Sequence, residues 1–346
     1  MSLSDMTAWM GALPEQRKLR EISMPGSHDA GVYREVSSKA ASVPVPKSMT
    51  SCQDRSVLEQ CEAGSRFFDI RLKVTATSIR AHHTTKGQGA VGESWDSTLE
   101  SVSAFLEAHP TECVILRLTK PSGGAADRII EEVLKSSLGQ KLYKSAGFTN
   151  FAETPLKSLR GKAICAFDPK EFSILHPSLG MHPFFRYEDN TRPKNMGLVT
   201  CGKYSNAGKI KDVIDGQVAK IDAHADHPEA HLFVLYWTQT TWVKNIEQNT
   251  KAVPQNAARQ RARVAGGAHH NMDYLKDLIC FGRDVKPGEA AVAATDAADR
   301  INIMPNVIMY DFVNADTSKK IVSLNAPGLQ PHLVKSAWWP PHKAAN

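Results

Sequence analysis

Apolar runs of strand length alternate with amphipathic segments along most of the chain. The clearest run is 112–120, ECVILRLTK, and its unbroken apolar stretch is typical of a parallel strand buried on both faces. Seven further segments of similar character are 18–25, 66–74, 77–83, 161–167, 196–201, 231–237 and 306–313. The pattern therefore predicts about eight strands, spread over nearly the whole sequence.

Helical periodicity fills several of the stretches between these strands. In 97–109 the apolar residues recur on one helical face, and Pro110 is expected to end the helix. Ser97 and Glu100 have the spacing of a capping box at its start. Comparable patterns occur at 125–139, 211–221 and 272–282. Strands and helices are thus expected to alternate.

This alternation predicts a single-domain α/β protein built as a distorted (β/α)8 barrel of the TIM type. A doubly wound open sheet is the alternative, but it would want a phosphate-binding glycine motif after its first strand. The sequence there, GSHDAG at 26–31, fits neither GxGxxG nor GxxxxGK[ST]. We expect residues 1–18 to form an N-terminal helical extension, 19–330 the barrel domain and 331–346 a C-terminal tail.

Composition and charge narrow the classes of partner. The chain has 346 residues, of which 42% are hydrophobic and 23% charged, as in globular proteins. Its net charge of +6 is too diffuse for a nucleic-acid-binding protein but suits an anionic substrate or an anionic membrane surface. The N-terminal twenty residues lack the basic start and apolar core of a signal peptide, which leaves export by another route or a cytoplasmic location open.

The six cysteines do not suggest a disulfide scaffold. None of them forms a CxxC pair, which argues against a zinc site. Cys113 and Cys165 lie in strand-like runs and are interpreted as core residues. A bond between Cys52 and Cys61 is the one pairing considered.

Candidate chemistry gathers at the carboxyl ends of the predicted strands, where barrel enzymes build their active sites. The residues are His28 and Asp29 after the first strand, Asp69 and Arg71 on one face of the second, His82 and His83 at the end of the third, and Asp311 in the last. Histidines, three carboxylates and an arginine are therefore expected on one rim.

Such a set is suited to phosphoryl transfer without a cofactor. One imidazole can take a proton from a hydroxyl nucleophile, and a second, protonated, can give one to the leaving oxygen. A guanidinium can neutralise the charge that grows on phosphate oxygens, and a carboxylate can orient the base. Each piece also has a plainer interpretation, Asp29 as the cap of a polar turn and Asp69 with Arg71 as an ion pair. Their shared place at strand ends favours the catalytic interpretation.

Four stretches together resemble the X domain of phosphatidylinositol-specific phospholipase C, the bacterial form in particular. They are ISMPGSHDAG (22–31), QDRSVLEQCEAGSRFFDIRL (53–72), IRAHHT (79–84) and TLESVSAFLEAHPTECVILRL (98–118). The resemblance covers about 19–120 closely, and it extends more thinly to LYWTQTT and NVIMYDFVN near the C-terminus. It implies the same barrel fold.

The resemblance implies a role for each matching residue. His28 corresponds to the general base that takes a proton from the inositol 2-hydroxyl, and His83 to the general acid that protonates the diacylglycerol oxygen. Arg71 corresponds to the arginine that holds the phosphate. The surrounding carboxylates are Asp29 and Asp69 near that arginine and Asp311 beside the base. The implied products are diacylglycerol and cyclic inositol 1,2-phosphate.

Contacts with the head group are implied less directly. The candidates are Tyr204, Lys120, His82 and Trp237. The family has a lysine where this chain has Thr119, and an aspartate where it has Gly202, so the head group stays open between phosphatidylinositol and related lipids. His82 and His83 exchange roles if the strand register shifts by one residue.

Arg71 also bears on metal dependence. The calcium-dependent branch of the family has a metal-ligating carboxylate at this position, so the resemblance implies that no cofactor is needed. Calcium bound weakly by Asp29 and Asp69 is the alternative. The expected partner is phospholipid at a membrane surface, met by a monomer that does not bind nucleic acid. Trp338 and Trp339 either touch that surface or pack on the barrel.

Two other functions remain open at this point. One is a metal-dependent barrel phosphodiesterase of the glycerophosphodiester or sphingomyelinase D kind, although that class would want a pair of acidic ligands where this chain has Asp69 and Arg71. The other is a non-catalytic module that binds inositol lipids. Secretion is what the family resemblance implies for location.

Overall fold

The computed structural model describes residues 2–33, 51–85, 88–122, 126–172, 175–187, 196–207, 212–213, 215–217, 220, 231–238 and 305–326. The predicted helix at 272–282 and the tail at 331–346, with Trp338 and Trp339, lie outside these residues. The predicted helix at 211–221 is described at 212–213, 215–217 and 220, and these residues are helical.

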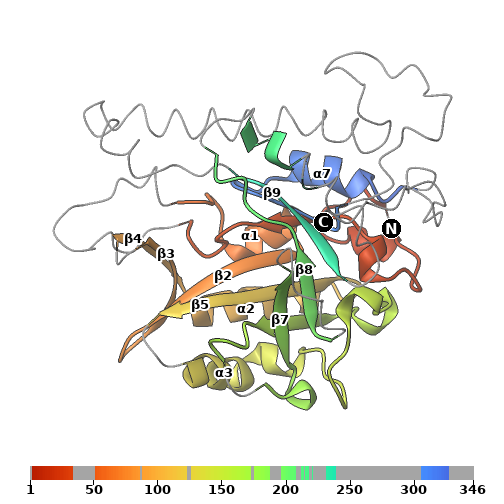
Figure 1. Cartoon of the computed structure of the whole chain (residues 1–346). Helices are drawn as coiled ribbons and strands as arrows, with labels where there is room; N and C mark the ends of the chain where they lie inside the picture. The colour runs from red at the N-terminus through yellow and green to blue at the C-terminus, as the bar shows by residue number, and fades with distance from the viewer. Residues whose placement is uncertain are drawn as a thin grey trace, which may run out of the picture.

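A closed parallel barrel forms the centre of the described structure (Figure 1). Its strands are β1 (Met24–Ser27), β2 (Phe67–Val74), β5 (Cys113–Ser122), β6 (Lys162–Phe167), β7 (Met181–Tyr187), β8 (Leu198–Cys201), β9 (Leu232–Trp237) and β10 (Val307–Tyr310). Each pairs in parallel with its neighbours in chain order, and β1 pairs with both β10 and β2, which closes the ring. The predicted distorted (β/α)8 barrel is therefore confirmed for the described strands.

The ring closes through a narrow seam. β1 aligns four residues with β10, but with β2 it aligns only Gly26 with Phe67 and Ser27 with Phe68. The strand also begins later than the sequence predicts, because 19–21 form a 3-10 turn, η2 (Leu19–Glu21). Pro25 and Gly26 lie inside β1 rather than in a turn after it. A Cβ on Gly26 would stand 2.7 Å from Val307 Cγ1, so the close approach of β10 explains this glycine.

One predicted barrel strand is wrong and another was missed. Segment 77–83 belongs to β3 (Ile79–Thr85), which runs antiparallel to β2 and pairs with β4 (Gln88–Ser94) in a hairpin outside the ring. The connection from β2 is too short for the crossover that a parallel neighbour needs. The missed strand is β7, whose sequence MHPFFRY is broken by His182 and Pro183 and therefore lacks a continuous apolar run.

The described helices cover the outside of the barrel: α1 (Val57–Glu62), α2 (Trp95–Ala108), α3 (Ala126–Lys135) and α7 (Ala315–Ser323). Short 3-10 segments add η1 (Trp9–Ala12), η4 (Ser137–Gln140), η5 (Phe151–Glu153), η6 (Leu156–Ser158) and η7 (Pro177–Leu179). The predicted cap of α2 is wrong: Ser94 accepts the capping hydrogen bond from the Ser97 amide, so the helix begins at Trp95. Its predicted apolar face is buried against the strands.

The N-terminal residues pack against the end of the barrel that is remote from the strand carboxyl ends. Arg66, just before β2, and Glu112, just before β5, form a fully buried ion pair of 2.8 Å. Glu112 also accepts the amides of Met10 and Gly11. Trp9 is fully buried and donates to the carbonyl of Gly64. Residues 2–18 thus form part of the folded unit at this end of the barrel.

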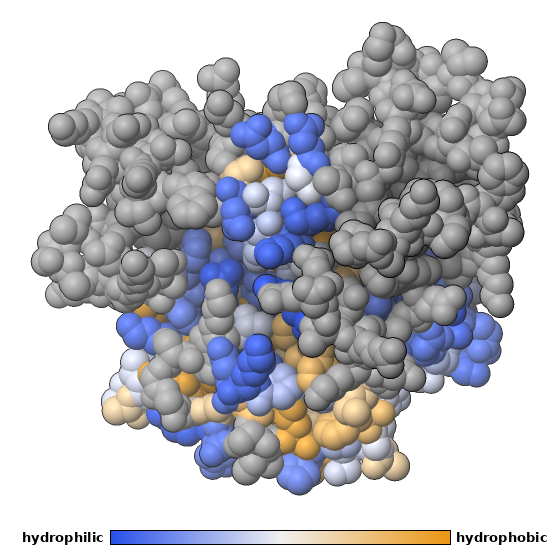
Figure 2. All heavy atoms as spheres, in the orientation of Figure 1, coloured by the Kyte–Doolittle hydropathy of each residue, from blue (hydrophilic) through white to orange (hydrophobic). Residues whose placement is uncertain are grey.

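The described surface carries few large apolar side chains, namely Leu134, Phe148, Leu179 and Met196. In Figure 2 hydrophilic residues run down the upper middle of the view, and hydrophobic ones gather mainly toward its lower part. No described helix is long and apolar enough to cross a membrane. The apolar residues that predicted the strands are buried in the core.

Candidate active site

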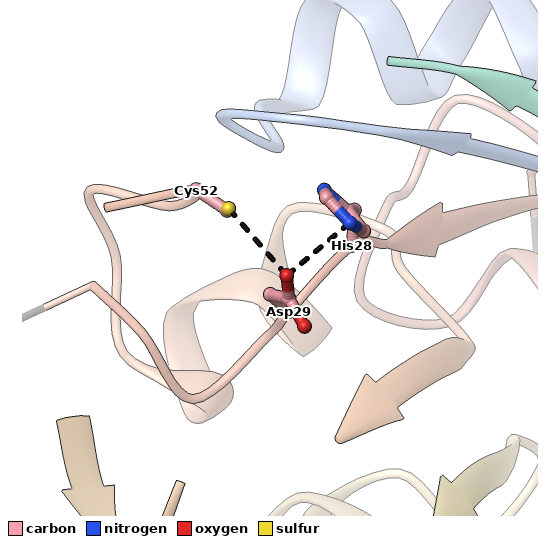
Figure 3. Close-up of side chains that lie close together, drawn as sticks. All are labelled: His28, Asp29 and Cys52. Atoms are coloured by element: carbon pink, nitrogen blue, oxygen red, sulfur yellow. Dashed lines mark hydrogen bonds and ion pairs between the residues drawn. The ribbon is translucent and has the colours of Figure 1, made fainter. Parts of the chain in front are cut away.

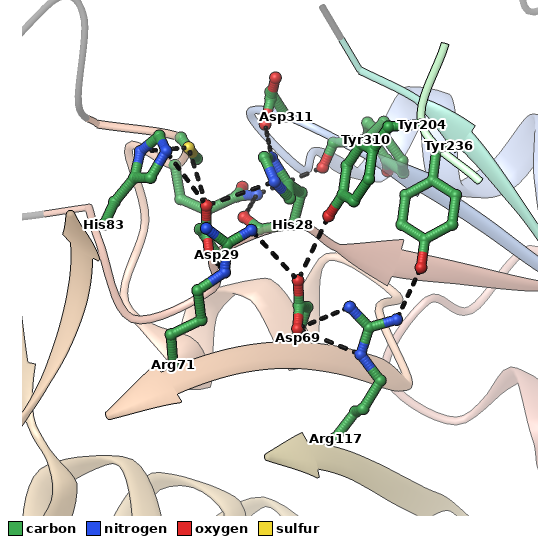
Figure 4. A network of polar contacts seen from close by, with 12 residues as sticks. His28, Asp29, Asp69, Arg71, His83, Arg117, Tyr204, Tyr236, Tyr310 and Asp311 are labelled. Atoms are coloured by element: carbon green, nitrogen blue, oxygen red, sulfur yellow. Dashed lines mark hydrogen bonds and ion pairs between the residues drawn. The ribbon is translucent and has the colours of Figure 1, made fainter. Parts of the chain in front are cut away.

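The polar side chains predicted from the sequence meet beside the ends of β1 and β10, the middle of β2 and the second half of β3 (Figure 4). The segment after β1 supplies the first pair, β2 the second, β3 one imidazole and the segment after β10 one carboxylate. These are His28 and Asp29, Asp69 and Arg71, His83, and Asp311. The antiparallel hairpin therefore brings its histidine to the rim even though β3 is not a barrel strand.

His28 is fixed on three sides. Its Nδ1 lies 2.8 Å from Asp311 Oδ1, and its Nε2 lies 3.3 Å from Asp29 Oδ2. The Gln53 amide donates to the carbonyl oxygens of His28, at 2.9 Å, and of Tyr310, at 3.2 Å. This clamp ties the end of β1 to the end of β10. The ring is therefore held with Nδ1 on one carboxylate and Nε2 toward the site.

Asp29 has a left-handed backbone conformation, with φ of 43°. Few residues other than glycine adopt it at low cost, and aspartate is among the more tolerant. Its turn is held by Ala30, whose amide donates to the carbonyl of Asp69, and by Val32, whose amide donates to that of Asp29. The strained turn brings the Asp29 carboxylate beneath both imidazoles.

The two imidazoles face each other across this carboxylate. The ring centroids of His28 and His83 are 6.3 Å apart, at an interplanar angle of 70°. Asp29 Oδ2 lies 3.3 Å from His28 Nε2 and 3.7 Å from His83 Nε2. The His83 side chain is 27% exposed and that of His28 is 10% exposed. Two rings at this separation are able to address the two ends of one phosphodiester.

Alternating charges continue from Asp29 into the barrel. Arg71 Nε lies 2.9 Å from Asp29 Oδ1, and its Nη2 lies 3.9 Å from Asp69 Oδ2. Asp69 Oδ1 accepts from Arg117 Nε at 3.1 Å and pairs with its Nη2 at 2.8 Å. Arg117 Nη1 reaches the Tyr236 hydroxyl at 2.7 Å. Each buried carboxylate thus has a guanidinium beside it, which compensates part of the cost of its burial.

Electrostatics shift the pKa of each group in this cluster. Burial disfavours the charged forms of His28 and His83, but neighbouring acidic groups outweigh it. The pKa of His28 lies well above its usual value, with Asp29 and Asp311 among the causes. Cys52 and Asp29 raise the pKa of His83 to about 9. Burial alone would raise the pKa of Asp29, but Arg71 and the imidazoles hold it below its usual range.

Of the four residues predicted to contact the head group, Tyr204 is the one whose described contacts are with His28 and Asp69. The Tyr204 ring lies 5.5 Å from that of His28, and its hydroxyl donates to Asp69 at 3.4 Å. His82 is buried, and as the neighbour of His83 in a strand it points to the opposite face of β3. Trp237, the last residue of β9, is also buried. Lys120 belongs to β5, but its side chain lies outside the described residues.

Arg117 and Cys52 are charged or reactive groups of the site that were not predicted from the sequence. Arg117 lies within the apolar run at 112–120, and a charged residue amid such a run is a signal, because a buried charge needs a partner. Cys52 has its Sγ 3.6 Å from His83 Nδ1 and 3.8 Å from Asp29 Oδ2. It carries a thiol, as does Cys61, so the disulfide considered between them is wrong. The imidazoles lower the pKa of Cys52 against the opposing effect of burial.

Comparisons with known proteins show which proteins the chain resembles. No family model matches the chain. Among curated proteins, a 1-phosphatidylinositol phosphodiesterase of Staphylococcus aureus (strain Newman) is 29% identical over 161 residues, which is 45% of this chain and 49% of the relative. One from Listeria monocytogenes serovar 1/2a (strain ATCC BAA-679 / EGD-e) is 33% identical over 110 residues, 32% of each chain. Over these parts, the chain is similar in sequence to bacterial proteins named 1-phosphatidylinositol phosphodiesterase.

Solved structures extend the likeness to the whole fold. The phosphatidylinositol-specific phospholipase C of Listeria monocytogenes superimposes with a TM-score of 0.59 and 19% identity, over 93% of this chain and 99% of that one. A Staphylococcus aureus enzyme of the same name, the F249X mutant, gives 0.62 and 18% over the same shares. In sequence, the chain matches about half or less of the length of its curated relatives. The shared architecture is thus broader than the shared sequence.

Proposed function

We propose that this chain is a phosphodiesterase of the phosphatidylinositol-specific phospholipase C type, acting on phosphatidylinositol or a related inositol lipid. The observation that carries the proposal is the pair of imidazoles 6.3 Å apart, with the Arg71 guanidinium held beside them by Asp29. The names of the curated relatives support the same activity. We place the catalytic domain at residues 19–330, with 1–18 as an extension and 331–346 as a tail, and we propose that the chain acts as a monomer.

The reaction follows from the positions of these groups. His28 Nε2 takes the proton of the inositol 2-hydroxyl, and the resulting oxygen attacks the adjacent phosphorus. The attack is intramolecular, so the nucleophile is already in place. His83 gives its proton to the glycerol oxygen as the bond from phosphorus to that oxygen breaks. Diacylglycerol leaves, cyclic inositol 1,2-phosphate remains, and water opens the ring in a slower second step.

The remaining charges support this proton transfer. Asp311 holds Nδ1 of His28 and stabilises the imidazolium that forms. Arg71 faces the negative charge that grows on the non-bridging phosphate oxygens. Because Asp29 and Asp69 are engaged by Arg71 and Arg117, guanidinium groups take the electrostatic role that calcium has in related barrels. We therefore propose that turnover is independent of metal.

Two alternatives are set apart by the same features. A metal-dependent glycerophosphodiester phosphodiesterase or sphingomyelinase D-like enzyme would lose activity in excess chelator, whereas the proposed reaction keeps it. A lipid-binding module would have no use for an acid–base pair held by Asp311 and Asp29. The arrangement around His28 and His83 favours catalysis.

Phosphorus NMR of the products tests the proposal most directly. The chain would be incubated with vesicles of single phospholipids, including phosphatidylinositol and phosphatidylcholine, with chelator present. A cyclic phosphodiester signal is expected from the inositol lipid and no turnover of the choline lipid, which lacks a neighbouring hydroxyl. An acyclic phosphate as the first product would rule out attack by the 2-hydroxyl.

The pH dependence of kcat/KM is expected to be bell-shaped and displaced toward alkaline pH. His28 must be neutral to accept a proton, and since its pKa is raised, activity grows only as the pH passes above the ordinary histidine range. His83 must be charged, so activity falls above its pKa of about 9. Asp29→Asn removes a charge that raises both values, and both limbs should move to lower pH. A profile that is flat from pH 6 to 10, or unmoved in the variant, would contradict the assignment.

A further inference from the structure

A cluster of metal-ligating atoms lies inside the candidate active site, and one of its members, the Cys52 thiol, has no part in the proposed reaction. Nε2 or Nδ1 of His28, a carboxylate oxygen of Asp29 and Sγ of Cys52 lie within 4.8 Å of one another (Figure 3). We propose that a thiophilic divalent ion of the zinc type binds these three residues and, with His83 as fourth ligand, holds the enzyme in an inhibited state. The inhibition rests on the proposed function, but the binding does not.

The separations fit a tetrahedral ion. Zinc bonds of about 2.3 Å to sulfur and about 2.0 to 2.1 Å to nitrogen or oxygen place neighbouring ligand atoms about 3.3 to 3.6 Å apart. Here His28 Nε2 and Asp29 Oδ2 are 3.3 Å apart, Asp29 Oδ2 and Cys52 Sγ are 3.8 Å apart, and Cys52 Sγ and His83 Nδ1 are 3.6 Å apart. Small side-chain movements would therefore complete the coordination.

The atoms behind the ligands are also arranged as zinc sites require. A ligating histidine commonly donates its other ring nitrogen to a carboxylate, which fixes the ring and strengthens the ligand. His28 has Asp311 at 2.8 Å from Nδ1, and this leaves Nε2 toward the cluster. Asp29 pairs with Arg71 through Oδ1 and turns Oδ2 toward His28 and Cys52. His28 and Asp29 thus each have a supporting contact on the side away from the cluster.

The backbone holds the thiol in place. The Cys52 amide donates to the carbonyl of Val32 at 3.2 Å, after β1, and its carbonyl accepts the amide of Phe312 at 2.9 Å, after β10. Gln53 adds its clamp on the His28 and Tyr310 carbonyls. The sulfur is therefore presented by the same strand ends that present the histidine, so little order has to be created when the ion binds.

The donor set decides which ion is bound and what binding does. Calcium takes six to eight oxygen ligands, and one carboxylate among sulfur and nitrogen donors does not supply them. Thiolate and imidazole favour zinc and related ions. A catalytic zinc keeps one coordination position open for substrate, whereas four protein ligands would fill every position on this ion. Two of the ligands would be the proposed base, His28, and the proposed acid, His83. An ion bound to both would therefore block proton transfer from the 2-hydroxyl and to the leaving oxygen.

Direct binding of Zn²⁺ and Co²⁺ tests the inference without reference to turnover. Calorimetry of the full chain is expected to show one Zn²⁺ per molecule, and Co²⁺ to give a sulfur-to-metal charge-transfer band that Zn²⁺ displaces. Cys52→Ser should lose the band and weaken Zn²⁺ binding by roughly 10- to 100-fold or more, the loss expected even for an outer-shell change. His28→Ala should weaken it similarly. Cys61→Ala, which removes a buried thiol within α1, should keep both the band and the affinity for Zn²⁺.

Inhibition is measured afterwards, with each variant in excess chelator as its own reference. Zn²⁺ should stop turnover by the wild type and by Cys61→Ala at concentrations that leave Cys52→Ser active. The inference is overturned if the wild type gives no cobalt–sulfur band, if the band survives in Cys52→Ser, or if Ca²⁺ displaces Co²⁺ as readily as Zn²⁺ does. Absence of phospholipase activity together with a normal cobalt band would instead refute the proposed function and leave the metal site standing.

Discussion

His28→Ala and His83→Ala are each expected to lower kcat by roughly 10²- to 10⁴-fold, the usual contribution of a positioned acid or base. Both side chains are near the rim and neither packs in the apolar core, so the barrel should stay folded in both variants. Circular dichroism and the melting temperature check this. His176→Ala removes an exposed histidine before η7 and should leave the rate unchanged.

The two histidines are told apart by the leaving group. A substrate in which a nitrophenol replaces the glycerol of the lipid has a leaving group that departs without protonation. His83→Ala should therefore recover much of its rate on this inositol phosphate ester, while His28→Ala should not. The reason is that a phenolate of low pKa needs no general acid, but the 2-hydroxyl always needs a base. Equal recovery of both variants would refute the assignment of roles, and near-normal rates of either on the lipid would refute the catalytic pair.

Replacement of Arg71 is the second change with a large expected effect. Loss of one preorganised donor to a developing oxyanion costs about 10²- to 10³-fold in kcat, and Arg71→Lys should fall near the lower end because it keeps the charge but not the planar fork. Arg71→Asp should lose more, since it adds a third carboxylate beside Asp29 and Asp69. The rates are measured on phosphatidylinositol vesicles in chelator.

Calcium should then distinguish the two Arg71 variants. Three neighbouring carboxylates offer the oxygen ligands that Ca²⁺ prefers, so added Ca²⁺ should restore part of the activity of Arg71→Asp and none of that of Arg71→Lys. Lys157→Asp, an equal charge reversal at an exposed position in η6, should turn over at the wild-type rate both in chelator and with added Ca²⁺. If Arg71→Asp turned over at the wild-type rate in chelator, the guanidinium would have no contact with the phosphate.

Much of the architecture could be predicted because the barrel strands are short apolar runs. The count of eight came out right for partly wrong reasons: 77–83 lies in a hairpin outside the ring, and β7 was missed. Periodicity cannot distinguish a barrel strand from a hairpin strand, since both alternate in the same way. Pairing direction is set instead by the length of the connection. Similarly, Ser94 rather than Ser97 caps α2, a choice that depends on where the hairpin ends.

The candidate site was predictable where motif residues lie directly beside strands, and not where distant segments meet. His28, Asp29, Asp69 and Arg71 flank or occupy β1 and β2, so their convergence follows from one strand pairing. Tertiary contacts bring in the others: Cys52 reaches the site through backbone bonds to segments after β1 and β10, and Arg117 through Asp69 and Tyr236. The spacing of residues in the sequence does not predict these contacts of Cys52 and Arg117.

The narrow seam between β1 and β2 has a consequence for how the protein would lose its proposed activity. The proposed base lies on one side of it and the phosphate-holding arginine on the other. Two residue pairs join the strands, with flanking contacts such as the bond from the Ala30 amide to the Asp69 carbonyl and the ion pair of Arg71 with Asp29. Loosening of this join parts the two halves of the machinery while the other seven junctions of the ring, as described, keep their pairing. Fraying at this single junction would then be enough to abolish the proposed activity while the rest of the barrel stays folded.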